Sequence, residues 1–260
     1  MRSLSFTPDR TNLVTVPIVK NCHGESTVLQ IMCFNAQSCR NKTTALKNVI
    51  IDKDLDVAVF TESWFSDQGD EALMTEMTPE GYTLKSFSRV GRGGGGITVV
   101  LREALSDCCS FEKLHSLKTC ECVSLQVRQK QASLLLLCLY RPPPSRRNKT
   151  TPAEFLEDFS ELLLQISTSQ SKLLIMGDFN FHYDSLTCPN VNRLKALLHD
   201  NSLHQVISEP THRHGHILDW LVAQEDHPSL QPSVTDLALG DHFAILCSLP
   251  FQYSKKPKRT

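Results

Sequence analysis

Short apolar runs separated by polar residues recur along the chain from Val28 onward, and they constrain the fold more than any other feature. Runs of about four to eight apolar residues between polar turns are typical of buried strands. We predict strands at residues 28–34, 57–60, 97–101, 123–127, 133–140, 172–176, 217–222 and 243–249. Helical spacing of apolar residues predicts helices at residues 45–50, 155–166 and 194–198.

Several neighbouring strands in this series follow one another with no helix between them. Parallel strands need a long crossover, usually a helix, so these pairs argue against a purely parallel sheet. We therefore predict an α/β fold, a four-layer α/β sandwich in which two mixed β-sheets pack face to face with helices outside. The helix at 155–166 has Thr151 as its cap and Pro152 in its first turn.

The strand-and-helix pattern continues with no linker and no internal repeat, so we predict one domain over residues 28–251. Residues 1–27 are polar, contain Pro8 and Pro17 and show no sustained periodicity, which predicts a loose leader. Residues 252–260 form a basic tail that we expect to be disordered. A solvated tail and a nuclear-import signal are both consistent with its charge.

Composition limits the classes of function. The 260 residues are 40% hydrophobic and 21% charged, which supplies a sizeable core. The net charge is −1, so any contact with nucleic acid must come from a local basic surface. No stretch reaches the roughly 20 apolar residues of a membrane span, and the N-terminus lacks a signal-peptide pattern. We therefore predict a nuclear or cytoplasmic protein that is not secreted, binds no membrane and keeps its ten cysteines reduced.

Polar residues stand where the apolar strands end. Asn35 follows the first strand and Glu62 the second, Tyr140 ends the long strand, and Asp178 and Asn180 follow the next one. Taken singly, each has a structural explanation, because Asp and Asn are common in turns after strands.

Two further positions are harder to explain as turns. Asp219 lies inside an apolar strand, where a carboxylate is unfavourable unless it is paired. Asp241 and His242 directly precede the last strand. The acidic residues and the histidine therefore call for a shared explanation.

Together these residues supply the parts of phosphodiester hydrolysis, which needs a metal ion, a base for the attacking water and donors for the developing charge. Mg²⁺ prefers a few carboxylates and keeps several waters, so Glu62 and Asp241 would suffice to hold it. A carboxylate such as Asp178 can orient and deprotonate water, and a histidine–aspartate pair can place a cationic imidazole against a phosphate.

Six segments, in this order, resemble the endonuclease/exonuclease/phosphatase superfamily, which has the DNase I-like fold. They are Phe34-Asn35-Ala36-Gln37-Ser38, Thr61-Glu62-Ser63-Trp64, Leu139-Tyr140-Arg141-Pro142, Gly177-Asp178-Phe179-Asn180, Leu218-Asp219-Trp220 and Gly240-Asp241-His242. Within the superfamily, the chain is most similar to the apurinic/apyrimidinic-type endonuclease domain of non-LTR retrotransposons. Residues 35–42, 140–143, 210–212 and 215–219 carry that closer similarity.

The resemblance implies a role for each matching residue. Glu62 would bind Mg²⁺, for which Mn²⁺ could substitute, with Asn35 and Asp241 as further metal ligands. Asp178 would activate the attacking water, and Asn180 would orient that water or stabilise the transition state.

Other matching residues are expected to act on the substrate. His242, held by Asp219, would contact the scissile phosphate, and Tyr140 would donate its hydroxyl to the same phosphate. The residues expected to bind the substrate beside the cleft are Arg141, Thr211 and His182.

The function implied by the resemblance is a monomeric, Mg²⁺-dependent endonuclease that nicks DNA and derives from a non-LTR retrotransposon. A phosphatase or ribonuclease of the same fold, and a catalytically weak binding module, are the alternatives. Basic residues favour nucleic acid as the substrate: Arg89, Arg92, Arg141, Arg146, Arg147 and Lys149. Because no polymerase follows the domain, we expect a host gene derived from such an element or a truncated copy of one.

Two departures from the family pattern bear on activity. Repair-type relatives usually have an aspartate at the position of Gln37, which points away from repair of abasic sites. Many relatives have a serine at the position of Gly240, so a possible hydroxyl contact is lost here. Separately, His212, His214 and His216 alternate along the chain; a zinc site and a loop beside the DNA site are both consistent with them.

Overall fold

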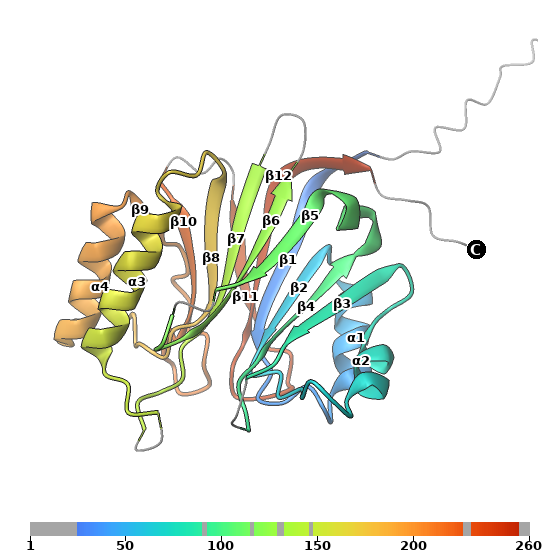
Figure 1. The fold of residues 1–260 in the computed structure, drawn as a ribbon, viewed down its shortest axis with the longest axis horizontal. Helices are drawn as coiled ribbons and strands as arrows, with labels where there is room; N and C mark the ends of the chain where they lie inside the picture. Colours follow the sequence, from blue (N-terminus) through green and yellow to red (C-terminus); the bar gives the residue numbers. More distant parts are fainter. Residues whose placement is uncertain are drawn as a thin grey trace, which may run out of the picture.

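Two six-stranded β-sheets pack face to face, and helices cover the outer face of each sheet (Figure 1). This is the predicted four-layer α/β sandwich. The computed structural model describes residues 25–89, 93–114, 117–128, 133–145, 148–225 and 230–254. Most of the predicted leader, residues 255–260 of the predicted tail, and Arg92, Arg146 and Arg147 of the predicted basic surface lie outside the described residues. No described helix is long and apolar enough to cross a membrane.

The first sheet joins strands from both ends of the domain, in the order β11-β12-β1-β2-β4-β3. Its strands are β1 (Glu25–Asn35), β2 (Val57–Thr61), β3 (Tyr82–Phe87), β4 (Ile97–Arg102), β11 (Gln231–Thr235) and β12 (Ala244–Ser254). Helices α1 (Thr43–Asp52) and α2 (Glu71–Met77) lie against its outer face (Figure 1). Among the described strands of this sheet, only β1 and β2 pair in parallel, and α1 is the crossover between them.

The second sheet has the order β5-β6-β7-β8-β10-β9. Its strands are β5 (Cys109–Lys113), β6 (Glu121–Arg128), β7 (Ser133–Tyr140), β8 (Lys172–Asp178), β9 (Leu203–Gln205) and β10 (Asp219–Gln224), and a 3-10 helix, η1 (Glu103–Cys108), precedes β5. Helices α3 (Pro152–Ile166) and α4 (Pro189–Asp200) cover its outer face. Strands β7 and β8 pair in parallel across α3, whose N-terminus has the predicted Thr151 cap with Glu154 completing a capping box.

The central strands are apolar on both faces because each face is covered. Ile31 and Cys33 of β1 face the core between the two sheets, whereas Met32 and Phe34 face α1 and α2. Strands buried on both sides lose the alternation of apolar and polar residues, which explains the uninterrupted apolar runs in the sequence.

The predicted strands and helices are all present, but some boundaries differ and some elements were not predicted. Strand β1 begins at Glu25 and β12 ends at Ser254, so three residues assigned to the leader and three assigned to the tail belong to the first sheet, where Glu25 pairs with Ser254 and Ser26 with Tyr253. The elements without a prediction are α2, β3, β5, β9 and β11. Strands β3, β5 and β11 lie at sheet edges and are only partly buried, so their sequences lack an apolar run.

Gly177 lies in the middle of the second sheet, at a position with no room for a side chain. Its φ is +146°, and a Cβ built there would lie 1.8 Å from the carbonyl oxygen of Leu139 on β7. The residue pairs with Leu139 on one side and Trp220 on the other, so the backbone has no room to move away. Gly177 therefore sets the close approach of β7 and β8 just before Asp178.

We expect Gly177→Ala to lower the free energy of unfolding by about 3 kcal/mol or more, since overpacking and a strained backbone add together. Chemical denaturation monitored by circular dichroism measures this loss. Gly81→Ala is the matched control: its φ is +78°, but nothing lies within 4 Å of an added Cβ, so only about 1 kcal/mol should be lost. Equal losses in the two variants would contradict a clash at Gly177.

Candidate active site

The polar residues predicted from strand ends meet at one edge of the sandwich, the lower edge in Figure 1. Four of these residues lie at the carboxyl ends of strands: Asn35 ends β1, Glu62 follows β2, Tyr140 ends β7 and Asp178 ends β8. Strands β10 and β12 run antiparallel to β8 and β1, so their amino ends bring Asp219 and the residues before β12 to the same edge. Topology alone therefore gathers residues that are far apart in the sequence.

Asn35 connects the carboxylates delivered by the two sheets. Its Nδ2 donates to Glu62 Oε1 at 3.1 Å and to Asp178 Oδ2 at 2.8 Å, and its Oδ1 accepts from the Gln37 backbone N–H at 3.0 Å. Asn35 is 1% exposed, so these bonds form away from bulk water. The amide thus fixes the separation between a carboxylate of the first sheet and one of the second.

Glu62 is held from a second side by Trp64. Trp64 Nε1 donates to Glu62 Oε2 at 3.2 Å, and both residues have left-handed backbone conformations, with φ of +50° for Glu62 and +57° for Trp64. Non-glycine residues in this region cost free energy and tend to occur at functional sites. The hydroxyl of Tyr140 also lies at Glu62; burial, and then the charge of Glu62, raise the pKa of Tyr140, which therefore stays a protonated donor.

Asp178, Asp219 and His242 form a buried cluster at the junction of the two sheets. Ligand atoms of the three side chains all lie within 4.8 Å of one another, and His242 Nδ1 lies 2.7 Å from Asp219 Oδ2. Asp178 and Asp219 are opposite each other in the pairing of β8 with β10. The imidazole therefore stands next to two acidic side chains that water does not reach.

This packing shifts the protonation equilibria of the cluster. Burial, and then the neighbouring Asp219, raise the pKa of Asp178 well above the ordinary range of a carboxyl group. Burial alone would lower the pKa of His242, but the contact with Asp219 outweighs it, and the pKa of His242 is raised to about 9. Asp178 is thus a strengthened base, and His242 is a cation at neutral pH.

Asp241 lies beside this cluster and contacts it through histidines. Its Oδ2 is 3.4 Å from His212 Nε2, and ligand atoms of Asp241, His212 and His242 lie within 4.8 Å of one another. Burial alone would raise the pKa of Asp241, but the hydrogen bond from Gln37 and the two histidines lower it below its ordinary value. Gln37, where repair-type relatives have an acid, is here a donor to Asp241.

The oxygen ligands predicted for the metal have the chemistry that suits a hard divalent cation, but Glu62 belongs to none of the described groups of acidic residues and histidines whose ligand atoms lie within 4.8 Å of one another. Glu62 and Asp241 supply carboxylate oxygens, and, among the described residues, Asp241 Oδ1 and Asp219 Oδ1 are buried side-chain atoms with no hydrogen-bond partner. Buried oxygens without partners are unfavourable unless a cation or a water is bound. Asn35 fits the predicted ligand role less well, because its Nδ2 and Oδ1 are both already engaged.

Arg141 is buried beside the active site and bonds within the protein. Its side chain is 2% exposed, its Nη1 donates to the carbonyl oxygens of Phe179 and Asn180 at 3.2 Å, and it packs on Phe155 and Phe181. Asn180 has a φ of +49°, and its Nδ2 returns bonds to the Arg141 carbonyl and to Asp178. Arg141 therefore supports the turn that carries Asp178 and Asn180, and its contact with substrate stays a prediction.

Thr211 is likewise buried and bonds within the protein, and its contact with substrate stays a prediction. It is 0% exposed, and its Oγ1 accepts from the backbone N–H groups of Leu218 and Asp219, both at 2.9 Å. The Thr211 carbonyl accepts from the Phe243 N–H at 2.7 Å. Thr211 therefore fixes the start of β10 relative to His242. His182, the third residue of this group, is exposed.

A larger cavity opens on the Glu62 side of the site. It has a volume of about 660 Å³ and is lined by residues that include Glu62, Trp64, Arg89, Tyr140 and Asn148. Arg89 pairs with Glu121 and lies over the Tyr140 ring at 5.4 Å. Trp64, which is 42% exposed, was not among the predicted site residues; its position two residues after Glu62, just past a strand end, was the available signal.

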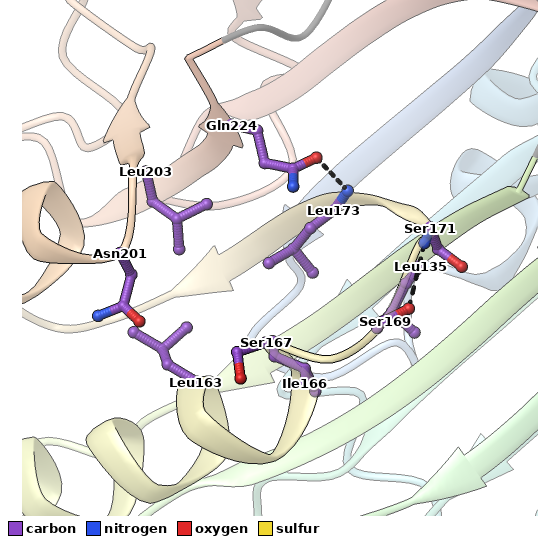
Figure 2. A pocket seen from close by; sticks show the side chains of 10 residues that line it. All are labelled: Leu135, Leu163, Ile166, Ser167, Ser169, Ser171, Leu173, Asn201, Leu203 and Gln224. Atoms are coloured by element: carbon purple, nitrogen blue, oxygen red, sulfur yellow. Dashed lines mark hydrogen bonds between the residues drawn. The ribbon is translucent and has the colours of Figure 1, made fainter.

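A second cavity lies at the opposite end of the second sheet and has no such chemistry (Figure 2). Its volume is about 130 Å³, and Leu163, Leu173 and Leu203 point into it beside Gln224. Gln224 Oε1 accepts from the Leu173 N–H at 3.1 Å, which satisfies the strand end there. Its lining residues are apolar or uncharged, so the cavity is a packing gap behind α3.

The fold and the buried carboxylate–histidine cluster at its edge define a DNase I-like α/β-sandwich protein. The family model described as the endonuclease/exonuclease/phosphatase family matches residues 32–242. The chain belongs to this family, whose members are mostly phosphodiesterases or phosphatases.

Solved structures share this fold at low sequence identity. The endonuclease domain of TRAS1, a telomere-specific non-LTR retrotransposon, is 15% identical with a TM-score of 0.64, covering 88% of this chain and 100% of its own. The AP endonuclease LMAP from Leishmania major is 12% identical with a TM-score of 0.67, covering 86% and 88%. A variant of the 3' phosphatase NExo from Neisseria, bound to a product DNA hairpin, is 14% identical with a TM-score of 0.64, covering 86% and 100%. No curated protein matches the sequence.

Proposed function

We propose that the protein is a Mg²⁺-dependent phosphodiesterase that nicks DNA, and that it derives from a non-LTR retrotransposon. The observation that supports this most is the pair of hydrogen bonds that the Asn35 side chain donates. One goes to Glu62, a carboxylate at the open cavity, and the other goes to Asp178 of the buried Asp178–Asp219–His242 cluster. Phosphodiester hydrolysis needs a cation site and a base within reach of the same phosphate.

In this proposal, each described side chain has one task. Asp178 removes a proton from the attacking water, and Asn180, bonded to it at 2.8 Å, keeps it oriented. His242 faces the phosphate as a cation, and Tyr140 donates its hydroxyl to a phosphate oxygen. A divalent cation bound by Glu62 and Asp241 supplies charge neutralisation when it is present.

The cavity beside Glu62 favours nucleic acid over a small phosphate ester. Trp64 offers an exposed indole on which a base can stack, whereas the charge of Arg89 next to Tyr140 is already paired with Glu121. Two proteins of similar fold support the same substrate: the TRAS1 endonuclease domain comes from a retrotransposon, and the Neisseria phosphatase is bound to a DNA product. A monomeric state and a nuclear or cytoplasmic location stay predictions from the sequence.

The test is conversion of supercoiled plasmid to the open circular form by the purified chain. We expect nicking with Mg²⁺ or Mn²⁺ and none with EDTA. Parallel reactions with structured RNA and with an inositol phosphate separate the alternatives. Plasmid left intact while one of these is hydrolysed would assign a ribonuclease or phosphatase, and inactivity on all three with retained DNA binding would assign a binding module.

Gly240 makes a gain of activity testable. An added Cβ would meet only Gln37 Oε1 at 3.7 Å and Phe34 Cζ at 3.9 Å, so a serine fits. We expect Gly240→Ser to raise the nicking rate about threefold to tenfold, the effect of one new hydrogen bond of roughly 1 kcal/mol. Gly240→Ala adds the Cβ without the hydroxyl and should leave the rate unchanged. Equal rates for the two variants would show that the hydroxyl makes no contact.

A further inference from the structure

His182, Asp184 and His216 form a third cluster, outside the groups used in the proposed function. Ligand atoms of the three side chains lie within 4.8 Å of one another. His216 Nδ1 is 2.9 Å from Asp184 Oδ2, and the His182 and His216 rings have centroids 4.0 Å apart. We propose that this cluster is a binding site for a transition-metal ion of the zinc class. The inference does not depend on the proposed nuclease activity.

The cluster is held in place by backbone contacts, so it exists before any ion binds. Asp184 Oδ1 accepts from the Ile217 N–H at 3.0 Å, and the Tyr183 N–H donates to the Ile217 carbonyl at 3.0 Å. These bonds join the segment that follows β8 to the segment that precedes β10. A preformed site loses little conformational entropy on binding, which favours affinity.

The ligand types select zinc over magnesium. Two imidazole nitrogens and one carboxylate are the ligands of many open zinc sites, whereas Mg²⁺ prefers oxygen ligands alone. Neighbouring ligand atoms in a tetrahedral site with bonds of about 2.0–2.1 Å lie roughly 3.3 Å apart, so only small rotations are needed from the observed separations. Asp184 and His182 are exposed and His216 is half-buried, which leaves a fourth position for water.

Electrostatics keeps the carboxylate ready to bind. Burial alone would raise the pKa of Asp184, but the hydrogen bonds from His216 and from the Ile217 backbone lower it. Asp184 is therefore ionised at neutral pH, as a metal ligand must be.

Metal binding at this site would restrain the segment before β10, which contacts the Asp178–Asp219–His242 cluster through Thr211. The Thr211 N–H donates to the His216 carbonyl at 3.0 Å, and Thr211 in turn fixes Asp219. His182 follows the Asn180 turn by two residues. An ion held between His182 and His216 would therefore join the Asn180 turn to the start of β10 and raise the stability of that edge of the sandwich.

The experiment is a Co²⁺ titration of the metal-stripped full chain, in excess Mg²⁺ so that sites with oxygen ligands are occupied. We expect intense visible absorption from one tetrahedral Co²⁺, displaced by Zn²⁺, and a higher melting temperature with Zn²⁺. Each of His182→Ala, Asp184→Asn and His216→Ala should weaken Zn²⁺ binding at least about tenfold, since each removes one ligand. In the metal-free protein, His182→Ala removes only the contact between the His182 and His216 rings. This variant should therefore fold normally, and it keeps the test valid if the other two variants fold poorly.

Two control variants locate the ion. His199→Ala removes an exposed histidine on α4 and should bind as the wild type does. His212→Ala removes a member of the neighbouring His212–Asp241–His242 group and should also keep the tetrahedral signal. Loss of the signal in His212→Ala alone would place the ion in that group and overturn the proposal. Equal Zn²⁺ affinity in all variants, or none in the wild type, would also overturn it and leave Asp184–His216 as a structural pair.

Discussion

Replacing Asp178 with asparagine is expected to lower the rate of plasmid nicking by about 10³-fold or more, because general-base catalysis alone contributes about 10²–10⁴-fold. Asparagine keeps the size of the side chain but cannot accept a proton from water. Asp178 Oδ2 also accepts from the side chains of Asn35 and Asn180, and its Oδ1 accepts from the Asn180 backbone N–H, so an amide NH2 in place of either oxygen loses at least one bond. Misplacement of Asn180 adds to the loss of the base.

The variant is informative only if it stays folded. Because burial and Asp219 raise the pKa of Asp178, its ionised form is disfavoured in the folded protein, and a neutral amide removes that penalty. One lost hydrogen bond costs about 1–3 kcal/mol in return, so the net change in stability should lie within about 2 kcal/mol. A melting curve gives this value, and Asp52→Asn, at an exposed position on α1, is the control with full activity. Unchanged nicking by Asp178→Asn would show that another group is the base or that the activity is a contaminant.

The parts of the site that could be predicted from sequence are those fixed by strand ends. Apolar runs located the central strands, and the residues directly after them had to lie at one edge once the sheets formed. Asp219 was informative because a carboxylate inside an apolar run needs a partner, and the structure supplies His242 at 2.7 Å.

The hydrogen-bond partners of the polar side chains around the site could not be predicted in the same way. Arg141 follows a strand in a basic stretch, which is consistent with a groove, yet the Asn180 turn leaves two carbonyl oxygens that need a buried donor. Thr211 likewise had no sequence signal for the two backbone N–H groups it accepts from. Backbone groups that need a side-chain partner arise from loop geometry, and loop geometry depends on contacts between residues that are distant in sequence.

The edge strands were missed for a related reason. Strand β11 contains Pro232 and mostly exposed residues, so neither its periodicity nor its β-propensity stands out. It forms because β12 presents an open row of backbone groups along its edge. The dual contact of Asn35 with Glu62 and Asp178 also depends on how the two sheets pack, which no local pattern encodes.

The second large effect is expected from Asp219→Asn, as a change in the pH dependence of nicking. In the wild type the contact with Asp219 outweighs burial, so the pKa of His242 is about 9 and the imidazole is cationic at neutral pH. On the alkaline side the rate should therefore stay high until it falls through about pH 9, and on the acid side it should fall as Asp178, whose pKa is raised by burial and by Asp219, becomes protonated. In the variant burial remains while the main charge that raised the pKa is gone, so the pKa of His242 falls and its cation is lost at lower pH.

The expected result is a rate about 10²-fold or more below that of the wild type near pH 8, where the variant imidazole is neutral, and a smaller difference from the wild type near pH 6, where the imidazole is protonated in both proteins. Rates of nicking measured across this range in constant ionic strength give the alkaline limb, and NMR titration of His242 gives its pKa directly. Asp200→Asn is the matched control, since it removes an exposed acid 3.8 Å from His199 on the surface and should leave the profile unchanged. The stability due to the His242–Asp219 contact follows the same sign: it is complete below the ordinary histidine pKa of about 6.5 and is lost as pH rises through about 9. An Asp219→Asn profile with its alkaline limb still near that of the wild type would mean that another group titrates there, and that His242 does not act as the cation.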